Sequence, residues 1–245
     1  MKLVYSSKNR MLVSGCSWTQ ESKMDHKRDW RPHWPSMLAK KLKKKYINFG
    51  RSGAGNQFIY NQVVDQYNGE DLICVLWSGF DRWDFLTDHT MSGTQKEPRK
   101  VWDALDESGF IDPIFNLKRS LRFIHAFQNF CEVNKIKYIH GLAINGQDFW
   151  RGPHEIHWQA KSSRRTILSE FIGDRLHEYL KEQHFIGWPI YYEFDGYCMS
   201  DYLNRLDKTK TELRVSKTDQ HPNGKGHEII ANLFYDRYIE LYGEL

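Results

Sequence analysis

Short apolar runs alternate with helix-length amphipathic stretches along most of the chain. The run LICVLWS, residues 72–78, begins with six consecutive apolar residues, which is typical of a strand covered on both faces. Because strands separated by helices pair in parallel through crossover connections, this pattern predicts a three-layer α/β/α sandwich around a mostly parallel five-stranded sheet. The predicted strands are residues 10–15, 46–50, 72–78, 137–143 and 189–194, and the predicted helices are residues 35–45, 57–67, 113–134, 165–183 and 223–242.

Length and charge narrow the class of protein further. A chain of 245 residues with 40% hydrophobic content can bury one sizeable core, so we expect a single domain over residues 1–245. The 35 Lys and Arg residues nearly match the 31 Asp and Glu residues, which argues against a nucleic-acid partner. The run KKLKKK, residues 40–45, is typical of a solvated helix face, with a phosphate-binding patch as the alternative.

The cellular setting is predicted from what the sequence lacks. No segment approaches 18 apolar residues, and the N-terminus has no signal-peptide pattern, so we expect a cytoplasmic protein with no membrane partner. The cysteines are too far apart in sequence to suggest a zinc site or a small disulfide framework. We expect four reduced and mostly buried thiols, at Cys16, Cys74, Cys131 and Cys198.

Polar segments rich in small residues follow the first three predicted strands. Ser17 lies in GCSWT after the first strand, GRSGAGN (residues 50–56) follows the second, and SGFDRWD (residues 78–84) follows the third. The carboxyl ends of parallel strands meet at one edge of a sheet, where binding sites of such folds are found. The longer irregular stretches, residues 87–112 and 145–163, are candidates for a rim or lid over this edge.

A histidine and an aspartate near the C-terminus can complete a nucleophilic site. A serine attacks a carbonyl only when a base removes its proton, and the base needs an orienting partner. His221 is such a base, and Asp219, two residues earlier, can reach the ring nitrogen that faces away from Ser17. We therefore expect Ser17, Gly53, Ser78 and His221 to lie together at one edge of the sheet.

The glycine-rich segment can supply hydrogen-bond donors. Its glycines permit a close approach of the backbone to a substrate, and we expect Asn56 to cap the helix that follows. Acyl transfer needs such donors around the oxyanion that develops. A phosphate-binding loop is the alternative, although the glycine spacing fits neither common nucleotide-binding pattern.

These segments, in this order, resemble the SGNH (GDSL-type) hydrolase superfamily. The segments that carry the resemblance are GCSWT, HWPSMLAKKL, NFGRSGAGN, WSGFDRWD and DQHPNGKGH. The resemblance implies a flavodoxin-like SGNH hydrolase fold in which Ser17 attacks an ester or amide carbonyl, His221 acts as general base and then acid, and Asp219 orients His221. It also implies that the backbone N–H groups of Ser17 and Gly53 donate to the oxyanion, and that no metal or organic cofactor is needed.

The chain departs from the family pattern at three places. Gly15-Cys16-Ser17 replaces the usual Gly-Asp-Ser, and Phe80 falls where the family has an asparagine that donates to the oxyanion. The candidates for a replacement donor are Ser78, Asp81 and Arg82. The last segment has Asp-x-His in place of Asp-x-x-His, which leaves Thr218 at the usual position of the acid.

Several other residues have two interpretations each. Cys16 is a second candidate nucleophile, and Arg82 can either bind an anionic substrate group or form a surface ion pair. HEIH (residues 154–157) has a spacing that could hold a metal, and His227 is interpreted as a surface or packing residue. Aromatic residues outside the core could stack on sugar rings, and the candidates are Trp30, Trp34, Trp83, Trp150 and Trp158.

We therefore predict an esterase or O-deacetylase that acts on a small acylated substrate, with acylated carbohydrates among the candidates, through an acyl-serine intermediate. The alternative is a catalytically weak SGNH-like module that binds a glycan or a protein. The Lys-rich helix and GCSWT also resemble SGNH-like proteins of tailed phages, which leaves open a structural role with virion protein partners. A nucleotide-binding α/β protein is the third hypothesis.

Overall fold

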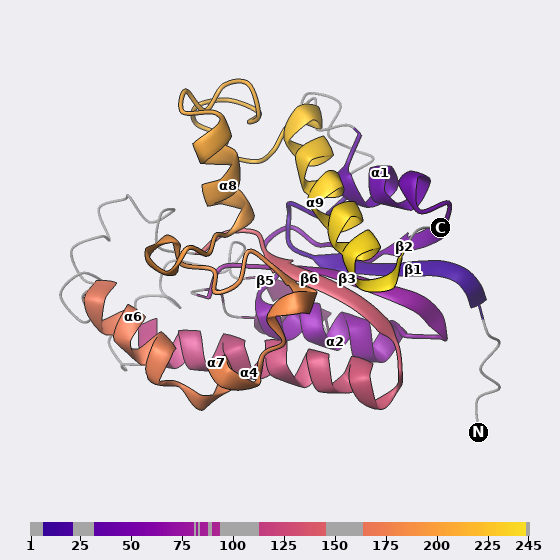
Figure 1. The fold of residues 1–245 in the computed structure, drawn as a ribbon, viewed down its shortest axis with the longest axis horizontal. Helices are drawn as coiled ribbons and strands as arrows, with labels where there is room; N and C mark the ends of the chain where they lie inside the picture. Colours follow the sequence, from indigo (N-terminus) through magenta and orange to yellow (C-terminus); the bar gives the residue numbers. More distant parts are fainter. Residues whose placement is uncertain are drawn as a thin grey trace.

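One parallel sheet forms the centre of the molecule. The computed structural model describes residues 7–21, 32–80, 82, 84–87, 90–93, 113–145 and 164–243. Within this part of the chain, five strands pair in parallel in the order β2-β1-β3-β6-β7, so the predicted fold class is confirmed (Figure 1). These strands are β1 (Ser7–Gly15), β2 (Lys45–Asn48), β3 (Glu70–Trp77), β6 (Lys137–Leu142) and β7 (Phe185–Ile186).

The side chains of the central strands alternate between two apolar layers. Met11 and Val13 of β1 belong to one buried cluster, whereas Leu12 between them belongs to the other. This is the period of two that an extended strand imposes. The strand β3 repeats the alternation and is buried on both faces, as its unbroken apolar run predicted.

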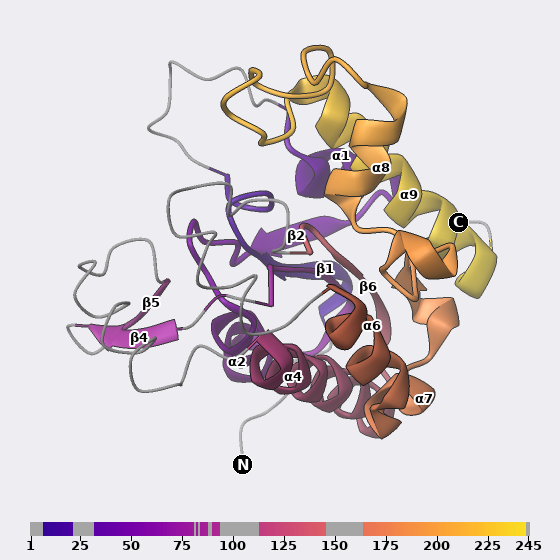
Figure 2. The same cartoon turned by 90° about the vertical axis from the view of Figure 1, so that its left-hand side faces the viewer.

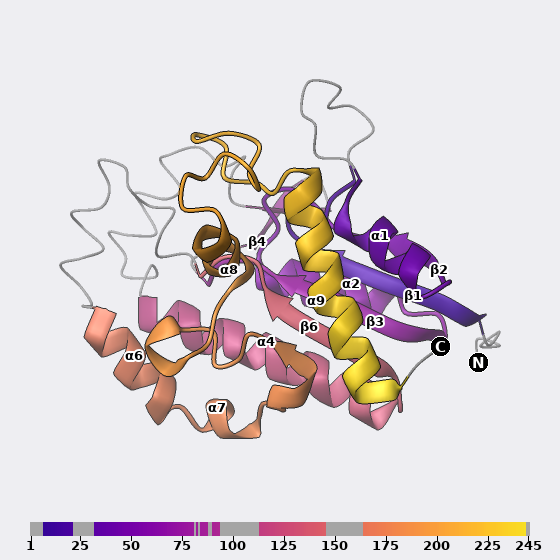
Figure 3. The same ribbon diagram turned by 45° about the horizontal axis from the view of Figure 1, so that its top comes forward.

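Helices cover both faces of the sheet. Figures 1 and 3 show α1 and α9 on one face and α2 and α4 on the other. On the first face the ring of Trp34 stacks on that of Phe234, with centroids 4.5 Å apart. No helix in the described part of the chain is both long and apolar enough to span a bilayer. The helices are α1 (Trp34–Lys41), α2 (Asn56–Gln66), α4 (Pro113–Val133), α6 (Arg164–Gly173), α7 (Arg175–Tyr179), α8 (Met199–Leu206) and α9 (Gly224–Tyr242), with short 3-10 helices η2 (Glu182–His184) and η3 (Tyr192–Phe194).

The fifth strand is not where the sequence predicted it. The prediction of a strand over residues 189–194 is wrong, because β7 comprises only Phe185 and Ile186, which pair with His140 and Gly141. Residues 192–194 instead form η3. The apolar character of this segment has another cause: Tyr191 is buried against the ring of Phe171, with centroids 5.0 Å apart.

Three further segments differ from the prediction. The helix expected over residues 165–183 is broken after Gly173, because Asp174 caps a new helix by accepting a hydrogen bond from the Leu176 N–H at 2.9 Å. The helix α8 was not predicted. Figure 2 shows the hairpin of β4 (Asp84–Thr87) and β5 (Thr90–Gly93), which lies partly in the stretch expected to be irregular.

Two buried histidines make folding sensitive to acid. Burial lowers the pKa values of His140 and His227 well below the ordinary value of 6.5. Below that pH the unfolded chain binds protons that the folded chain does not, so the free energy of unfolding falls as the pH drops, by about 1 kcal/mol per pH unit for each histidine. Urea unfolding at pH 7.5 and 5.5 measures this loss. In His227→Phe the loss should be smaller, and an unchanged pH dependence would contradict this explanation.

Candidate active site

Ser17 lies in a tight turn at the carboxyl end of β1. The turn closes with a hydrogen bond from the Thr19 N–H to the Cys16 carbonyl at 2.9 Å. Gly15 is required just before it, because a Cβ there would contact the side chain of Thr19 and lie 2.8 Å from the Leu76 carbonyl oxygen. Ser17 is thereby held at the edge of the sheet, and the residue is 4% exposed.

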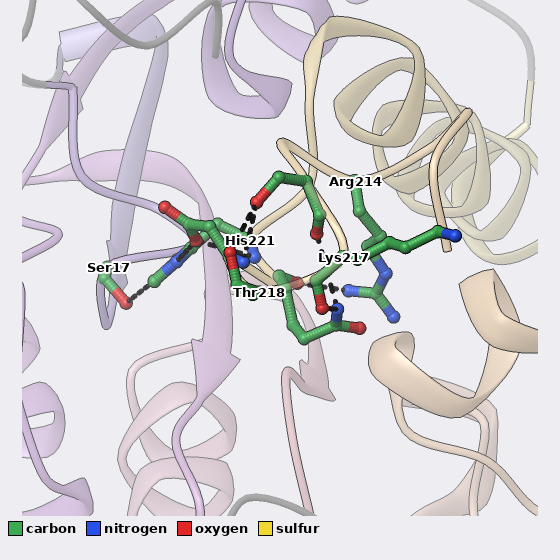
Figure 4. A network of polar contacts seen from close by, with 8 residues as sticks. Ser17, Arg214, Lys217, Thr218 and His221 are labelled. Atoms are coloured by element: carbon green, nitrogen blue, oxygen red, sulfur yellow. Dashed lines mark hydrogen bonds and ion pairs between the residues drawn. The ribbon is translucent and has the colours of Figure 1, made fainter. Parts of the chain in front are cut away.

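The structure brings Ser17, His221 and Asp219 together. Ser17 Oγ lies 2.8 Å from His221 Nε2, and His221 Nδ1 lies 2.6 Å from Asp219 Oδ1 (Figure 4). With the proton on Nδ1, the ring donates to the carboxylate, and the lone pair on Nε2 accepts from the Ser17 hydroxyl. This is the arrangement in which a histidine can remove the serine proton.

The loop before α9 carries the carboxylate that contacts His221 at residue 219, one residue later than the Asp-x-x-His pattern would place it. The Asp219 N–H donates to Ser216 Oγ at 2.9 Å, and the Ser216 N–H donates to the Asp219 carbonyl at 3.1 Å. Thr218 Oγ1 lies 3.1 Å from Ser216 Oγ, so it belongs to the turn. The Asp-x-His spacing therefore delivers a carboxylate to His221 without a contribution from Thr218.

The glycine-rich segment is tied to the serine turn. The Arg51 N–H donates to the Gly15 carbonyl at 3.0 Å, and Asn48 Nδ2 donates to the Thr19 carbonyl at 2.7 Å. Gly53 follows with a φ of 77°, in the left-handed region that favours glycine. Among the described residues, neither the Ser17 N–H nor the Gly53 N–H has a hydrogen-bond acceptor.

Asn56 joins two of these segments from within the core. Its Oδ1 accepts from the Ser78 N–H at 2.8 Å, and its Nδ2 donates to the Ser78 carbonyl at 3.2 Å and to Ser120 Oγ at 3.0 Å. The prediction that Asn56 caps α2 is wrong, because the capping position is Gly55. Asn56 instead joins the start of α2 to the end of β3, and its amide nitrogen is engaged in these bonds.

The start of α2 is capped by Asp84, which sequence reasoning missed. Its carboxylate accepts from the Gly55 N–H at 2.7 Å and from the Phe58 N–H at 2.9 Å. Burial raises the pKa of Asp84, and these N–H groups with the charges of Arg119 and Arg82 act in the opposite direction. The cap comes from a residue 29 positions along the chain, so no local capping pattern could reveal it.

The candidate replacement donors lie in different surroundings. Arg82 is half-buried and its Nη1 approaches the Ala54 carbonyl at 3.5 Å, next to Gly53. Ser78 is fully buried, and its Oγ has no hydrogen-bond partner in the described part of the chain. Phe80 is buried in the core, and its side chain has no hydrogen-bond donor. Asp81 lies outside the described residues.

The alternative nucleophile is turned away from His221. Cys16 is fully buried in the apolar cluster beneath α1 and α9. Neighbouring side chains at the end of a strand point to opposite faces, and here only Ser17 of the pair meets the histidine. The geometry therefore favours Ser17 as the nucleophile.

The remaining sequence interpretations have mixed outcomes. Trp34 is fully buried, so its interpretation as a residue outside the core is wrong. His227 is a packing residue beside the ring of His33, with centroids 4.9 Å apart. No cluster of potential metal ligands occurs among the described residues. HEIH and four of the candidate aromatic residues lie outside them, namely Trp30, Trp83, Trp150 and Trp158.

Comparison with known proteins identifies the fold. No family model and no curated protein matches the sequence. A GDSL-like lipase from Bacteroides thetaiotaomicron matches the structure with a TM-score of 0.51 at 16% identity, over 95% of this chain and 89% of its own. A mutant of Axe2, an acetyl-xylooligosaccharide esterase from Geobacillus stearothermophilus, matches with a TM-score of 0.50 at 15% identity, over 96% of each chain.

This chain therefore has a three-layer α/β/α fold with Ser17, His221 and Asp219 in contact at the edge of its sheet. The fold is that of the GDSL-type (SGNH) hydrolases, as the sequence resemblance predicted. The resemblance to phage proteins stays a prediction.

Proposed function

We propose that this protein is a serine esterase that cleaves small acyl esters through an acyl-serine intermediate. The observation that carries the proposal is the unbroken path of hydrogen bonds from Ser17 Oγ through the His221 ring to Asp219. A serine that only packed against other side chains would need no hydrogen bonds to a histidine and an aspartate. A serine that loses its proton during attack does need them.

In the first step, His221 Nε2 takes the Ser17 proton as Oγ bonds to the ester carbonyl carbon. The tetrahedral intermediate collapses when the bond to the alcohol oxygen breaks and His221 returns the proton to the leaving alcohol. In the second step, His221 removes a proton from water, whose oxygen attacks the acyl-serine. The bond between Ser17 Oγ and the acyl carbon then breaks as His221 returns the proton to Oγ, and the carboxylic acid leaves and ionises in water, so no reactant besides ester and water is consumed.

The backbone N–H groups of Ser17 and Gly53 are the proposed donors to the oxyanion. Both lack an acceptor among the described residues, and the left-handed conformation of Gly53 sets the direction of its peptide group. Arg82 is the proposed third donor, because its guanidinium lies beside the same loop.

Acetylated carbohydrates are the proposed substrate class. The low exposure of Ser17 favours a small acyl group. The fold match to a protein described as an acetyl-xylooligosaccharide esterase supports acetyl as that group. Acetate release from acetylated xylo-oligosaccharides and from p-nitrophenyl acetate tests the proposal, with Ser17→Ala as the control. We expect slow release by the unmodified protein and faster cleavage of acetyl esters than of octanoyl esters.

A glycan-binding module is the second candidate. It is favoured by Phe80, which stands at the position of the family's oxyanion asparagine but is buried and has no side-chain donor. If the unmodified protein and Ser17→Ala release acetate equally slowly from every ester, the esterase proposal fails. Binding of xylo-oligosaccharides by both proteins would then support the module.

A further inference from the structure

A buried arginine, Arg214, contacts both the turn that carries Ser17 and the segment that carries His221. Arg214 is 1% exposed, although it carries a charged guanidinium. Burial lowers its pKa to about 10, so it keeps its charge at neutral pH. A charge in the interior is costly unless hydrogen bonds and opposite charges compensate it, so the contacts of this guanidinium indicate what it does.

The guanidinium bonds to the segment that carries the histidine. Arg214 Nη1 donates to the Gln220 carbonyl at 2.6 Å, and Gln220 is the residue between Asp219 and His221 (Figure 4). The backbone of Arg214 also forms an antiparallel bridge with Pro222. Arg214 thus contacts this segment at two points, through its side chain at Gln220 and through its backbone at Pro222.

The same side chain reaches the serine turn and α8. Its Cζ lies 5.1 Å from the centre of the Trp18 ring, and Trp18 directly follows Ser17. Its Nη2 donates to the Ser200 carbonyl and to Asn204 Oδ1, both at 2.8 Å. The helix α8 thereby holds in place the guanidinium that contacts both Gln220 and Trp18.

We propose that Arg214 is a positioning residue that fixes the Asp219–His221 segment against the Ser17 turn. The expected effect of Arg214 on reaction rate rests on the proposed function. Its effect on the position of His221 does not depend on any substrate. Loss of the guanidinium removes the donor to Gln220 and the cation over Trp18 together. A displacement of about 1 Å between nucleophile and base is enough to lower a rate by about 10²-fold.

Two readouts test the proposal separately. The first is the rate at which an alkyl fluorophosphonate labels Ser17, measured by intact mass. The second is the NMR signal of the His221 Nδ1 proton, which reports the hydrogen bond to Asp219 without any reaction. Lys217→Met is the matched control, because it removes an exposed positive charge from the same loop.

Arg214→Ala should lower the labelling rate by about 10²-fold and weaken or shift the His221 signal, while Lys217→Met leaves both unchanged. Guanidinium ion at a non-denaturing concentration should restore part of the lost rate in Arg214→Ala. If Arg214→Ala does not fold, Arg214→Lys takes its place in both measurements. Its single ammonium cannot span Gln220 and Asn204, so it should still alter both readouts.

The outcomes distinguish this inference from the proposed function. If the unmodified protein is not labelled, the esterase proposal fails, and the His221 signal alone tests the role of Arg214. If the folded Arg214 variants keep both the labelling rate and the His221 signal, Arg214 serves stability only and the inference is overturned.

Discussion

Replacing Ser17 with alanine should reduce hydrolysis of p-nitrophenyl acetate to the uncatalysed background, and replacing His221 with alanine should have a similar effect. The two residues share one hydrogen bond and act as a unit, so removal of either disables proton transfer and attack together. For an efficient enzyme the loss in kcat is on the order of 10⁴- to 10⁶-fold. The double variant should lose no more than either single variant.

Cys16→Ala is the matched control for this result. Cys16 is adjacent in sequence but buried in the apolar core, so its replacement should leave kcat within a few-fold of the unmodified protein once folding is verified. Activity that survives in Ser17→Ala and disappears in Cys16→Ala would transfer the nucleophile to the thiol.

The second large effect concerns the oxyanion. Arg82→Ala should lower kcat by about 10²–10³-fold with little change in KM, because a donor to the oxyanion acts mainly in the transition state. Arg122→Ala is the matched control, since Arg122 is an exposed arginine on α4. Steady-state kinetics of the two variants on one ester separates the local role of Arg82 from a general effect of charge.

Three other outcomes have distinct meanings. A rise in KM alone would make Arg82 a substrate clamp. A loss confined to Ser78→Ala would identify the buried hydroxyl as the donor. No loss in either variant would contradict both assignments, and the backbone N–H groups of Ser17 and Gly53 would remain as the donors.

The sequence predicted the parts of the fold that local patterns determine. The apolar run of β3 predicted that helices cover this strand on both faces, and both of its faces are buried. The pairing of Ser17 with His221, 204 positions apart, was predicted through the resemblance and the rule that strand ends converge.

The missed features depend on contacts between distant segments. Tyr191 and Phe194 are apolar because they pack on Phe171 of α6, and no local pattern separates that cause from membership of a sheet. Asp84 and Arg214 bond to backbone groups, which carry no side-chain signature in the sequence. Asn56 looked like a cap because asparagine often is one, whereas its partner is the end of β3.

The central claim is that Ser17 is a nucleophile activated by His221. Peptide mapping by mass spectrometry after treatment with an alkyl fluorophosphonate tests it most directly. We expect one phosphonate on Ser17, full labelling of Cys16→Ala, and strongly reduced labelling of His221→Ala. An adduct on another residue, or equal labelling of Ser17 with and without His221, would contradict the claim.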